Sequence, residues 1–289
     1  MSDRARSCRP VVPALLLLAF PFAAPATVTA GSPGDRVLVT GWNSSNVLGY
    51  DATGSFTGAL LTAGNGLSLA HSLTRGPDGF VYVTSFGNDS VLRYDAKTAT
   101  NLGVFVTSGL GGLNGPSSAA FGPDGRFYVT GNQSGTLQVY NGSTGGSLGT
   151  LISGLTGPEA VLFKDDGNLL IVSGPTNTVL EYNTAGVFQG VFVSPGNGLS
   201  DPHDGLFGPD GTFYLSGFGA AKVLAYNGVT GVFIEVFVED DPSTPAVRGN
   251  PVTAGPWPGQ LSKVSSKVLS GKSRTLPLGP VPEQYQQVE

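Results

Sequence analysis

One spacing recurs five times in this chain and limits its fold more than any other feature. A glycine is followed by a tyrosine 15 residues later in four consecutive units, and the segment from Asp35 to Tyr50 keeps the same offset. The four pairs are Gly79 and Tyr94, Gly125 and Tyr140, Gly167 and Tyr182, and Gly211 and Tyr226. Each glycine closes a turn block, Gly-Pro-Asp-Gly in three copies and Lys-Asp-Asp-Gly in one, at intervals of 46, 42 and 44 residues. Proline presets the first turn dihedral and glycine supplies the positive one, so every unit contains a tight turn at the same place.

Each unit also contains four short runs that are rich in Val, Phe, Tyr and Leu. In the second unit, one run follows the turn at 80–84, a second ends at Tyr94, and a third covers 103–106. A fourth run precedes each turn block, for example 159–163 or 203–207. No stretch before residue 258 keeps a helical apolar period. Four short strands every 42 to 46 residues predict an all-β fold, a β-propeller of four-stranded blades with five repeats visible.

The tyrosines that end the second run are predicted to be core residues. A single blade cannot bury both of its faces, so blades must stack around an axis. We expect the five rings to pack between blades, with each hydroxyl hydrogen-bonded near an edge. They are Tyr50, Tyr94, Tyr140, Tyr182 and Tyr226.

Closure of the ring is open to two interpretations. The first unit begins at its second strand, at 35–40, and no innermost strand precedes it. The segment 250–255 resembles 201–205, where the innermost strand of the fifth unit starts. A C-terminal strand that completes the first blade would close a five-bladed ring and leave no open edge. The alternative is a truncated member of a six- or seven-bladed family.

The two ends of the chain have different compositions from the repeats. Three arginines precede an apolar run at 11–22, and small residues follow up to Ala30, which is the pattern of a secretory signal peptide. We therefore expect a signal peptide at 1–30, the propeller at 31–257 and a disordered, mildly basic tail at 258–289. This organisation predicts a secreted protein, periplasmic or extracellular.

Charge and cysteine content exclude several classes of function. The chain has 15 basic and 20 acidic residues, a net charge of −5, and only 12% charged residues. This balance provides no basic surface for nucleic acid or for an anionic membrane. The single cysteine, Cys8, lies in the predicted signal peptide, which excludes a disulfide framework and a thiolate site in the folded part. We expect a monomer with neither nucleic-acid binding nor membrane insertion.

The repeats resemble those of the NHL and streptogramin-lyase (virginiamycin B lyase-like) propellers. The runs 81–84 and 127–130 also echo the YVTN repeat, and the resemblance covers residues 35–256. It implies a site around the axial opening, on the face where the innermost strands begin. In the streptogramin-lyase-like family, a histidine that follows proline takes part in such a site. Pro202 and His203 match this pattern, whereas Ala70 precedes His71.

One slot of the repeat collects the ionisable candidates for this site. The residue eight before each turn glycine is His71, Ser117, Glu159 or His203, so both histidines of the chain share the slot. Propeller geometry puts this slot at the rim of the channel, where His71, Glu159 and His203 can converge, with Ser117 and Asp204 nearby. Two imidazoles and a carboxylate suit a divalent metal ion such as Mg²⁺, or a base and acid pair with His203 or His71 as the base. The alternative is a slot that tolerates polar side chains because it faces channel water.

A second slot, seven residues after the turn glycine, holds Trp42, Phe86, Asn132, Gly174 and Phe218. Its aromatic rings are expected on the same face, either as an apolar floor for a sugar, macrocycle or peptide or as caps of the core between blades. The candidate ligand-binding residues from both slots and their neighbours are Trp42, Phe86, Asn132, Phe218, Ser117 and Asp204.

Two classes of function remain. The first is a secreted binding or scaffold propeller that holds a peptide, glycan, small molecule or envelope partner on its channel face. The second is a metal-assisted lyase of the streptogramin-lyase type. The binding function is favoured because few ionisable residues converge on the axis.

Overall fold

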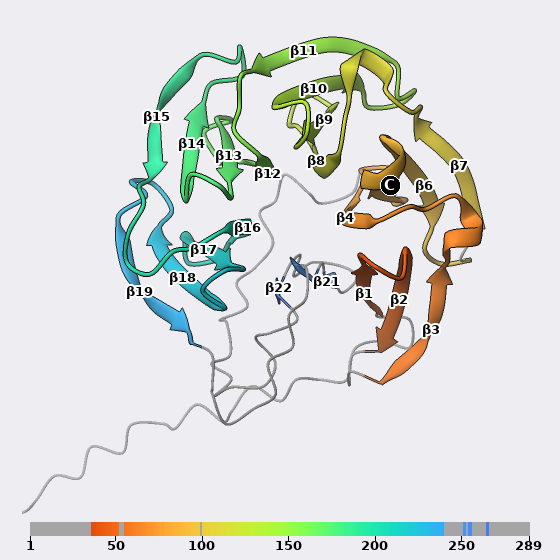
Figure 1. Ribbon diagram of the computed structural model, residues 1–289, viewed down its shortest axis with the longest axis horizontal. Coiled ribbons are helices and arrows are strands. Elements are labelled where there is room, and N and C mark those ends of the chain that lie inside the picture. The colour runs from red at the N-terminus through yellow and green to blue at the C-terminus, as the bar shows by residue number, and fades with distance from the viewer. Residues whose placement is uncertain are drawn as a thin grey trace, which may run out of the picture. The chain divides into compact units, whose positions relative to one another are not determined.

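The computed structural model describes residues 36–51, 55–98, 100–239, 251–252, 254–255 and 264–265. These residues form five four-stranded antiparallel sheets arranged as a five-bladed β-propeller, as the repeats predict (Figure 1). The predicted signal peptide lies outside the described residues, as does the predicted tail except for Val264–Ser265. No helix in the described ranges is long and apolar enough to cross a membrane.

Four blades are contiguous in sequence, and each runs from an innermost to an outermost strand. Blade 2 consists of β4 (Ala70–Arg75), β5 (Val81–Ser85), β6 (Ser90–Asp95) and β7 (Thr100–Val106). Blade 3 consists of β8 (Pro116–Phe121), β9 (Arg126–Gly131), β10 (Thr136–Asn141) and β11 (Ser147–Ser153). Blade 4 consists of β12 (Pro158–Phe163), β13 (Leu169–Ser173), β14 (Thr178–Tyr182) and β15 (Phe188–Val193). Blade 5 consists of β16 (Pro202–Phe207), β17 (Thr212–Gly217), β18 (Lys222–Asn227) and β19 (Phe233–Val238).

Blade 1 is assembled from both ends of the described chain. Its strands β1 (Arg36–Gly41), β2 (Asn46–Asp51) and β3 (Phe56–Leu61) are joined by the short strand β21 (Ala254–Gly255). The register pairs Arg36 with Gly255 and Val37 with Ala254, antiparallel. The prediction of a five-bladed ring closed by a C-terminal strand is therefore confirmed.

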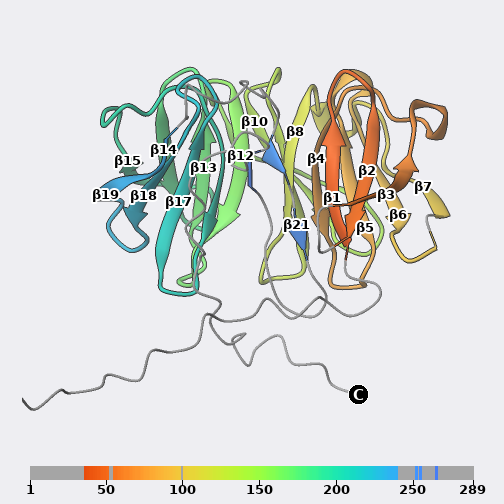
Figure 2. The same cartoon turned by 90° about the horizontal axis from the view of Figure 1, so that it is seen from below.

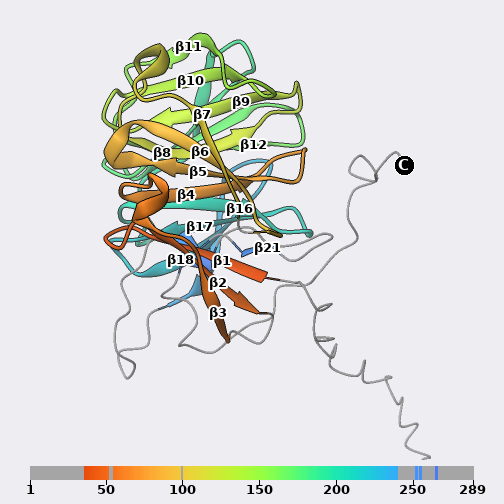
Figure 3. The ribbon, with the colours of Figure 1, turned by 90° about the vertical axis from the view of Figure 1, so that its right-hand side faces the viewer.

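Other short elements flank the blades. Strand β20 (Pro251–Val252) pairs with β22 (Val264–Ser265), so two residues of the predicted disordered tail form a strand. Three 3-10 turns connect strands: η1 (Ala63–Asn65), η2 (Phe86–Asn88) and η3 (Leu110–Gly112). The innermost strands surround the axis and the outermost strands β3, β7, β11, β15 and β19 form the perimeter, while the side views show strands running across the thickness of the ring (Figures 1, 2 and 3).

The core is divided into layers that lie between successive blades. Each of four buried clusters takes residues from two neighbouring blades, and each contains the repeat tyrosine of the later blade or packs against it. Tyr94, Tyr140 and Tyr226 are at most 1% exposed, whereas Tyr182 is half-buried beside its cluster. The equal spacing of glycine and tyrosine therefore marks the same position in each of these four layers, as predicted, whereas Tyr50 belongs to none of the four clusters and its ring contacts Phe56 of its own blade.

The expectation for the tyrosine hydroxyls is correct at one position and wrong at two. The hydroxyl of Tyr140 donates to the carbonyl of Leu110 at 2.8 Å. Those of Tyr94 and Tyr226 are buried and have no hydrogen-bond partner among the described residues. Burial raises the pKa of both phenols to about 12. At Tyr140 the acceptor is supplied by η3, which contains Leu110.

Candidate functional site

The site begins with an irregularity in the innermost strands. In β8, β12 and β16, the register against the second strand skips one residue, which is Ser117, Glu159 or His203. A similar shift in β4 includes His71. Such a β-bulge leaves the extra residue out of the ladder and turns its side chain in a new direction. The slot found in the sequence is thus the bulge position of each blade, and three bulges carry ionisable side chains.

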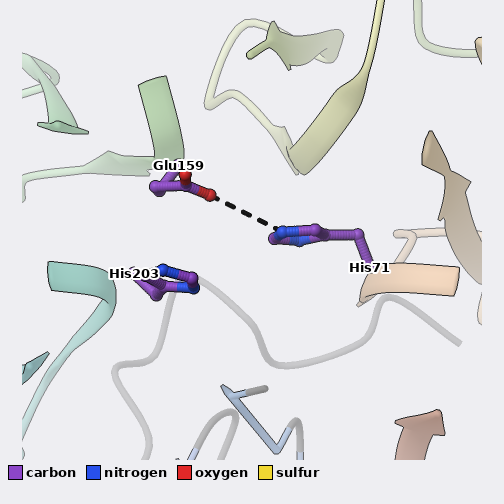
Figure 4. A group of neighbouring side chains, drawn as sticks. All are labelled: His71, Glu159 and His203. Carbon is purple, nitrogen blue, oxygen red and sulfur yellow. Dashed lines mark ion pairs between the residues drawn. The ribbon is translucent and has the colours of Figure 1, made fainter. Parts of the chain in front are cut away.

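Three of these side chains meet at the ring axis. Each of His71, Glu159 and His203 offers one ligand atom, and the three atoms lie within 4.8 Å of one another. Figure 4 shows the side chains pointing toward a common region from β4, β12 and β16. His71 Nε2 is 3.6 Å from Glu159 Oε2, and the side chains are only 7% and 12% exposed. The sequence placed these residues where they could converge, and the structure brings them together.

The carboxylate of Glu159 is held on both sides. Its Oε1 accepts a hydrogen bond of 2.8 Å from Asn132 Nδ2, while its Oε2 faces His71 and accepts no hydrogen bond among the described residues. Burial raises the pKa of Glu159, and the nearby charges of Asp201 and Asp204 act in the same direction. The surroundings of Glu159 therefore favour binding of a proton or a cation by its carboxylate.

Sequence reasoning missed Asp201 as a member of this site. Asp201 Oδ2 lies 3.4 Å from His203 Nε2, and the other imidazole nitrogen, Nδ1, is buried with no hydrogen-bond partner among the described residues. Asp201 adopts the left-handed backbone region, with φ of 48°. A Cβ at Gly174 would lie 2.6 Å from Asp201 Oδ1 and 3.3 Å from Glu159 Cγ, so a glycine there makes room for both acids. The Asp-Pro-His triplet was the available signal, but its acid was not assigned a role.

The aromatic slot packs directly against the two histidines. The ring of Phe86 stacks on His71 at a centroid distance of 5.8 Å, and that of Phe218 stacks on His203 at 4.8 Å. Trp42 contacts His71 edge-on at 5.2 Å and Phe86 at 4.9 Å. The three rings predicted to form an apolar floor thus pack against the imidazoles. Phe218 nevertheless remains 37% exposed.

The remaining candidates occupy different positions. The hydroxyl of Ser117 is fully buried and lies 2.9 Å from Thr130 Oγ1 and 2.6 Å from the carbonyl of Pro158, so it joins blades 3 and 4. Asp204 is buried, and its Oδ1 accepts the backbone N–H of Gly205 at 2.8 Å. Among the described residues, these hydrogen bonds of Ser117 and Asp204 are therefore made within and between the strands of the blades.

Comparison with known proteins connects the fold to several solved propellers. Virginiamycin B lyase from Staphylococcus aureus matches with a TM-score of 0.55 at 17% identity, over 76% of this chain and 70% of that one. A streptogramin B lyase matches with a TM-score of 0.55 at 14% identity, over 76% and 69%. A chain of a nidogen/laminin complex matches with a TM-score of 0.54 at 16% identity, over 71% and 81%.

Comparison by sequence finds no family model and no curated protein that matches this chain. The structural similarities are therefore similarities of fold. The resemblance inferred from the repeats is confirmed at this level, and the chain is a five-bladed β-propeller similar in fold to the streptogramin lyases.

Proposed function

We propose that this chain is a binding propeller that holds a divalent metal ion, and beside it a peptide, glycan or other small ligand, at the ring axis. The observation that carries the proposal is the convergence of His71, Glu159 and His203, from three different blades, within 4.8 Å. A cation among these atoms would offset the cost of burying the Glu159 carboxylate, whose side chain is only 12% exposed.

The donor set suits zinc better than magnesium. Two imidazoles and one carboxylate are a common zinc set, whereas Mg²⁺ prefers oxygen ligands and retains its waters. Tetrahedral zinc needs ligand atoms about 3.4 Å apart, and His71 Nε2 and Glu159 Oε2 are already 3.6 Å apart. Glu159 Oε2 and His203 Nδ1 also lack hydrogen-bond partners among the described residues, which fits atoms that await a cation.

The surroundings of this triad support ligand binding next to the ion. A bound divalent ion would act as a Lewis acid toward an oxygen of the ligand. Asp201 adds negative charge beside His203, and the ring of Phe218, which stacks on His203, offers an exposed apolar surface. A few polar groups beside apolar side chains are typical of small-molecule and peptide sites.

Calorimetric titration of the full-length protein with Zn²⁺, Mn²⁺ and Mg²⁺ tests the proposal. We expect saturable zinc binding with one ion per chain, weakened by about tenfold or more in His203→Ala and Glu159→Gln and retained in Asp165→Asn, a control at an exposed turn acid. Absence of heat with all three ions, together with an unchanged melting temperature, would refute it.

A second candidate function is a metal-assisted lyase, in which Glu159 would hold the ion and His203 would act as the base instead of a ligand. The specific observation in its favour is the Asp201–His203 pair, because an acid that orients one nitrogen leaves the other to take a proton. One fold neighbour is described as a catalytically inactive virginiamycin B lyase with quinupristin. Incubating the zinc- or magnesium-loaded protein with quinupristin, and following its mass and chromatographic retention, tests this activity. Unchanged quinupristin after prolonged incubation would favour the binding function.

For localisation, we infer export from the arginine-led apolar segment at 1–30. Expression with the native N-terminus in a Gram-negative bacterium, followed by N-terminal sequencing of the periplasmic fraction, is expected to find Gly31 as the first residue. A cytoplasmic product that starts at Met1 would contradict export.

A further inference from the structure

The two histidines of the axial site are carried by the same local arrangement in two different blades. In blade 2, His71 lies in the bulge of β4 and Phe86 follows the end of β5. In blade 5, His203 lies in the bulge of β16 and Phe218 follows the end of β17. The blades without a histidine differ in both slots: Ser117 accompanies Asn132 in blade 3, and Glu159 accompanies Gly174 in blade 4. Within these four blades, histidine and phenylalanine therefore occur together.

In each pair the phenyl ring lies nearly parallel to the imidazole. The interplanar angle is 22° for Phe86 and His71 and 25° for Phe218 and His203. The two imidazoles are themselves only 16° apart in orientation, with centroids separated by 6.3 Å. Trp42 contacts the rings of both His71 and Phe86 edge-on. The imidazole planes thus share one orientation, with a phenyl ring beside each.

The partial exposure of Phe218 indicates that its main role is its contact with His203 and not the burial of its own ring. Phe218 is 37% exposed, so it contributes less to the core than a fully buried ring. A phenyl ring has no donor atom for a metal ion, and the contact of each ring with the proposed ligands is its stack on an imidazole. Fixing the plane of a ligating imidazole is a recognised task of the residues around a metal.

We propose that Phe86 and Phe218 are positioning residues, which hold the imidazole planes of His71 and His203 so that both can converge with Glu159 on one cation. This inference rests on the proposed metal-binding function. It goes beyond that function by assigning the two rings a role in orienting the metal ligands, whether or not the exposed part of Phe218 also contacts an organic ligand.

Matched substitutions test the proposal in the full-length protein. The test variants are Phe86→Leu and Phe218→Leu, the conservative variants are Phe86→Tyr and Phe218→Tyr, and the control is Phe188→Leu, an exposed ring that packs on Tyr182 in the outer part of blade 4. We expect each leucine variant to weaken zinc binding about tenfold. The tyrosine variants and the control should bind zinc like the wild type, because they keep a ring at each position of the pair.

Nuclear magnetic resonance of the imidazoles separates this inference from the metal proposal. The chain has only two histidines, so their side-chain signals can be assigned by single substitution. In the metal-free protein, each leucine variant should remove the phenyl contribution to the ring-current shift of its own histidine and leave the shift of the other histidine in place. If the wild type fails to bind zinc while these shifts behave as expected, the proposed function fails but the orientation by the rings stands.

A double-mutant comparison completes the test. In the His203→Ala background, Phe218→Leu should cause no further loss of whatever zinc affinity remains, because the ring acts only through the imidazole. Leucine variants that bind zinc as tightly as the wild type, with unshifted imidazole signals, would overturn the proposal. An equal loss in the control Phe188→Leu would also overturn it, since a general loss of stability would then explain the effect.

Discussion

The side-chain Oδ1 of Asn177 in blade 4 accepts the backbone N–H of Asp201, at the entry to blade 5, at a distance of 2.7 Å. This bond ties the turn of one blade to the residue that pairs with His203 in the next. The same latch recurs elsewhere, although the acceptor changes. The other two instances are Ser45 Oγ with the N–H of Leu69, at 2.9 Å, and Asp89 Oδ1 with the N–H of Gly115, at 2.8 Å.

Asn177→Gly isolates the contribution of this latch. Asn177 has a φ of 55°, which glycine adopts freely, so the substitution removes the acceptor without backbone strain. The N–H of Asp201 loses its partner, and we expect a loss of about 1–2 kcal/mol in the free energy of unfolding. Urea unfolding measures it. Ala221→Gly, at the same turn position of blade 5 with a φ of 55°, is the control and should instead gain about 1 kcal/mol. Equal stability of wild type and Asn177→Gly would show that the latch contributes nothing.

Gly145 is predicted to be far less replaceable than Gly125. Both have left-handed φ values, 71° and 73°, so alanine meets a similar backbone penalty of about 1 kcal/mol at either position. A Cβ at Gly145 would also overlap the carbonyl oxygen of Phe105 in the neighbouring blade, whereas nothing lies within 4 Å of one at Gly125. We expect Gly145→Ala to cost about 3 kcal/mol or more and Gly125→Ala about 1 kcal/mol. Similar thermal midpoints for the two variants would contradict this packing between blades.

Removal of a repeat tyrosine hydroxyl should have opposite effects in different blades. Tyr140→Phe loses the bond to Leu110 and should cost about 1 kcal/mol. Tyr94→Phe and Tyr226→Phe remove buried hydroxyls that lack a partner among the described residues, and each should stabilise the protein by about 1 kcal/mol. Chemical denaturation of the three variants is the measurement, and destabilisation by all three would indicate partners for the second and third hydroxyls.

Glu159→Gln should change the pH dependence of stability in the metal-free protein. The raised pKa of Glu159 means that the folded state binds the proton more tightly than the unfolded state, so stability is lost as pH rises from about 4.5 through the folded-state pKa. Glutamine can still accept the bond from Asn132 but does not titrate. The difference in unfolding free energy should therefore grow in favour of the variant between pH 4.5 and neutral pH.

The same variant should lose zinc affinity by about tenfold or more. In the wild type, zinc binding should strengthen with rising pH, because the ion competes with protons for the carboxylate and imidazoles. For the stability prediction, parallel pH profiles of the unfolding free energy in the wild type and Glu159→Gln would contradict a raised pKa of Glu159.

Closure by β21 predicts a defined effect of truncation. Deletion of residues 250–289 leaves β1 with an unpaired edge, and we expect a loss of about 1–2 kcal/mol and concentration-dependent association. Urea unfolding and light scattering report the two effects. Deletion of residues 270–289 retains β21 and β22 and should leave both properties unchanged. A 250–289 deletion that stays monomeric and fully stable would show that the pairing is dispensable.

Much of the site was accessible from the repeat, because equivalent positions of a propeller occupy equivalent places around the axis. The shared slot of His71, Glu159 and His203 therefore predicted their proximity across distant parts of the chain. The role of the second slot was less accessible, since the sequence allowed Phe86 and Phe218 either to face a ligand or to pack internally. Their stacking on the histidines depends on side-chain orientation, which spacing does not encode.

The sequence by itself determined the five-fold repetition, the all-β class and the residue types at the axis, because turn chemistry and strand patterning are local and act within each unit. Tertiary structure alone decided which atoms meet. The bulges turn the side chains of Glu159 and His203 out of their strands. The absence of a side chain at Gly174 leaves space for Asp201 beside Glu159. Asn132, from another blade, donates a hydrogen bond to one carboxylate oxygen of Glu159. The contacts of Asp201 and Asn132 join segments from neighbouring blades, so they exist only once those blades have packed together.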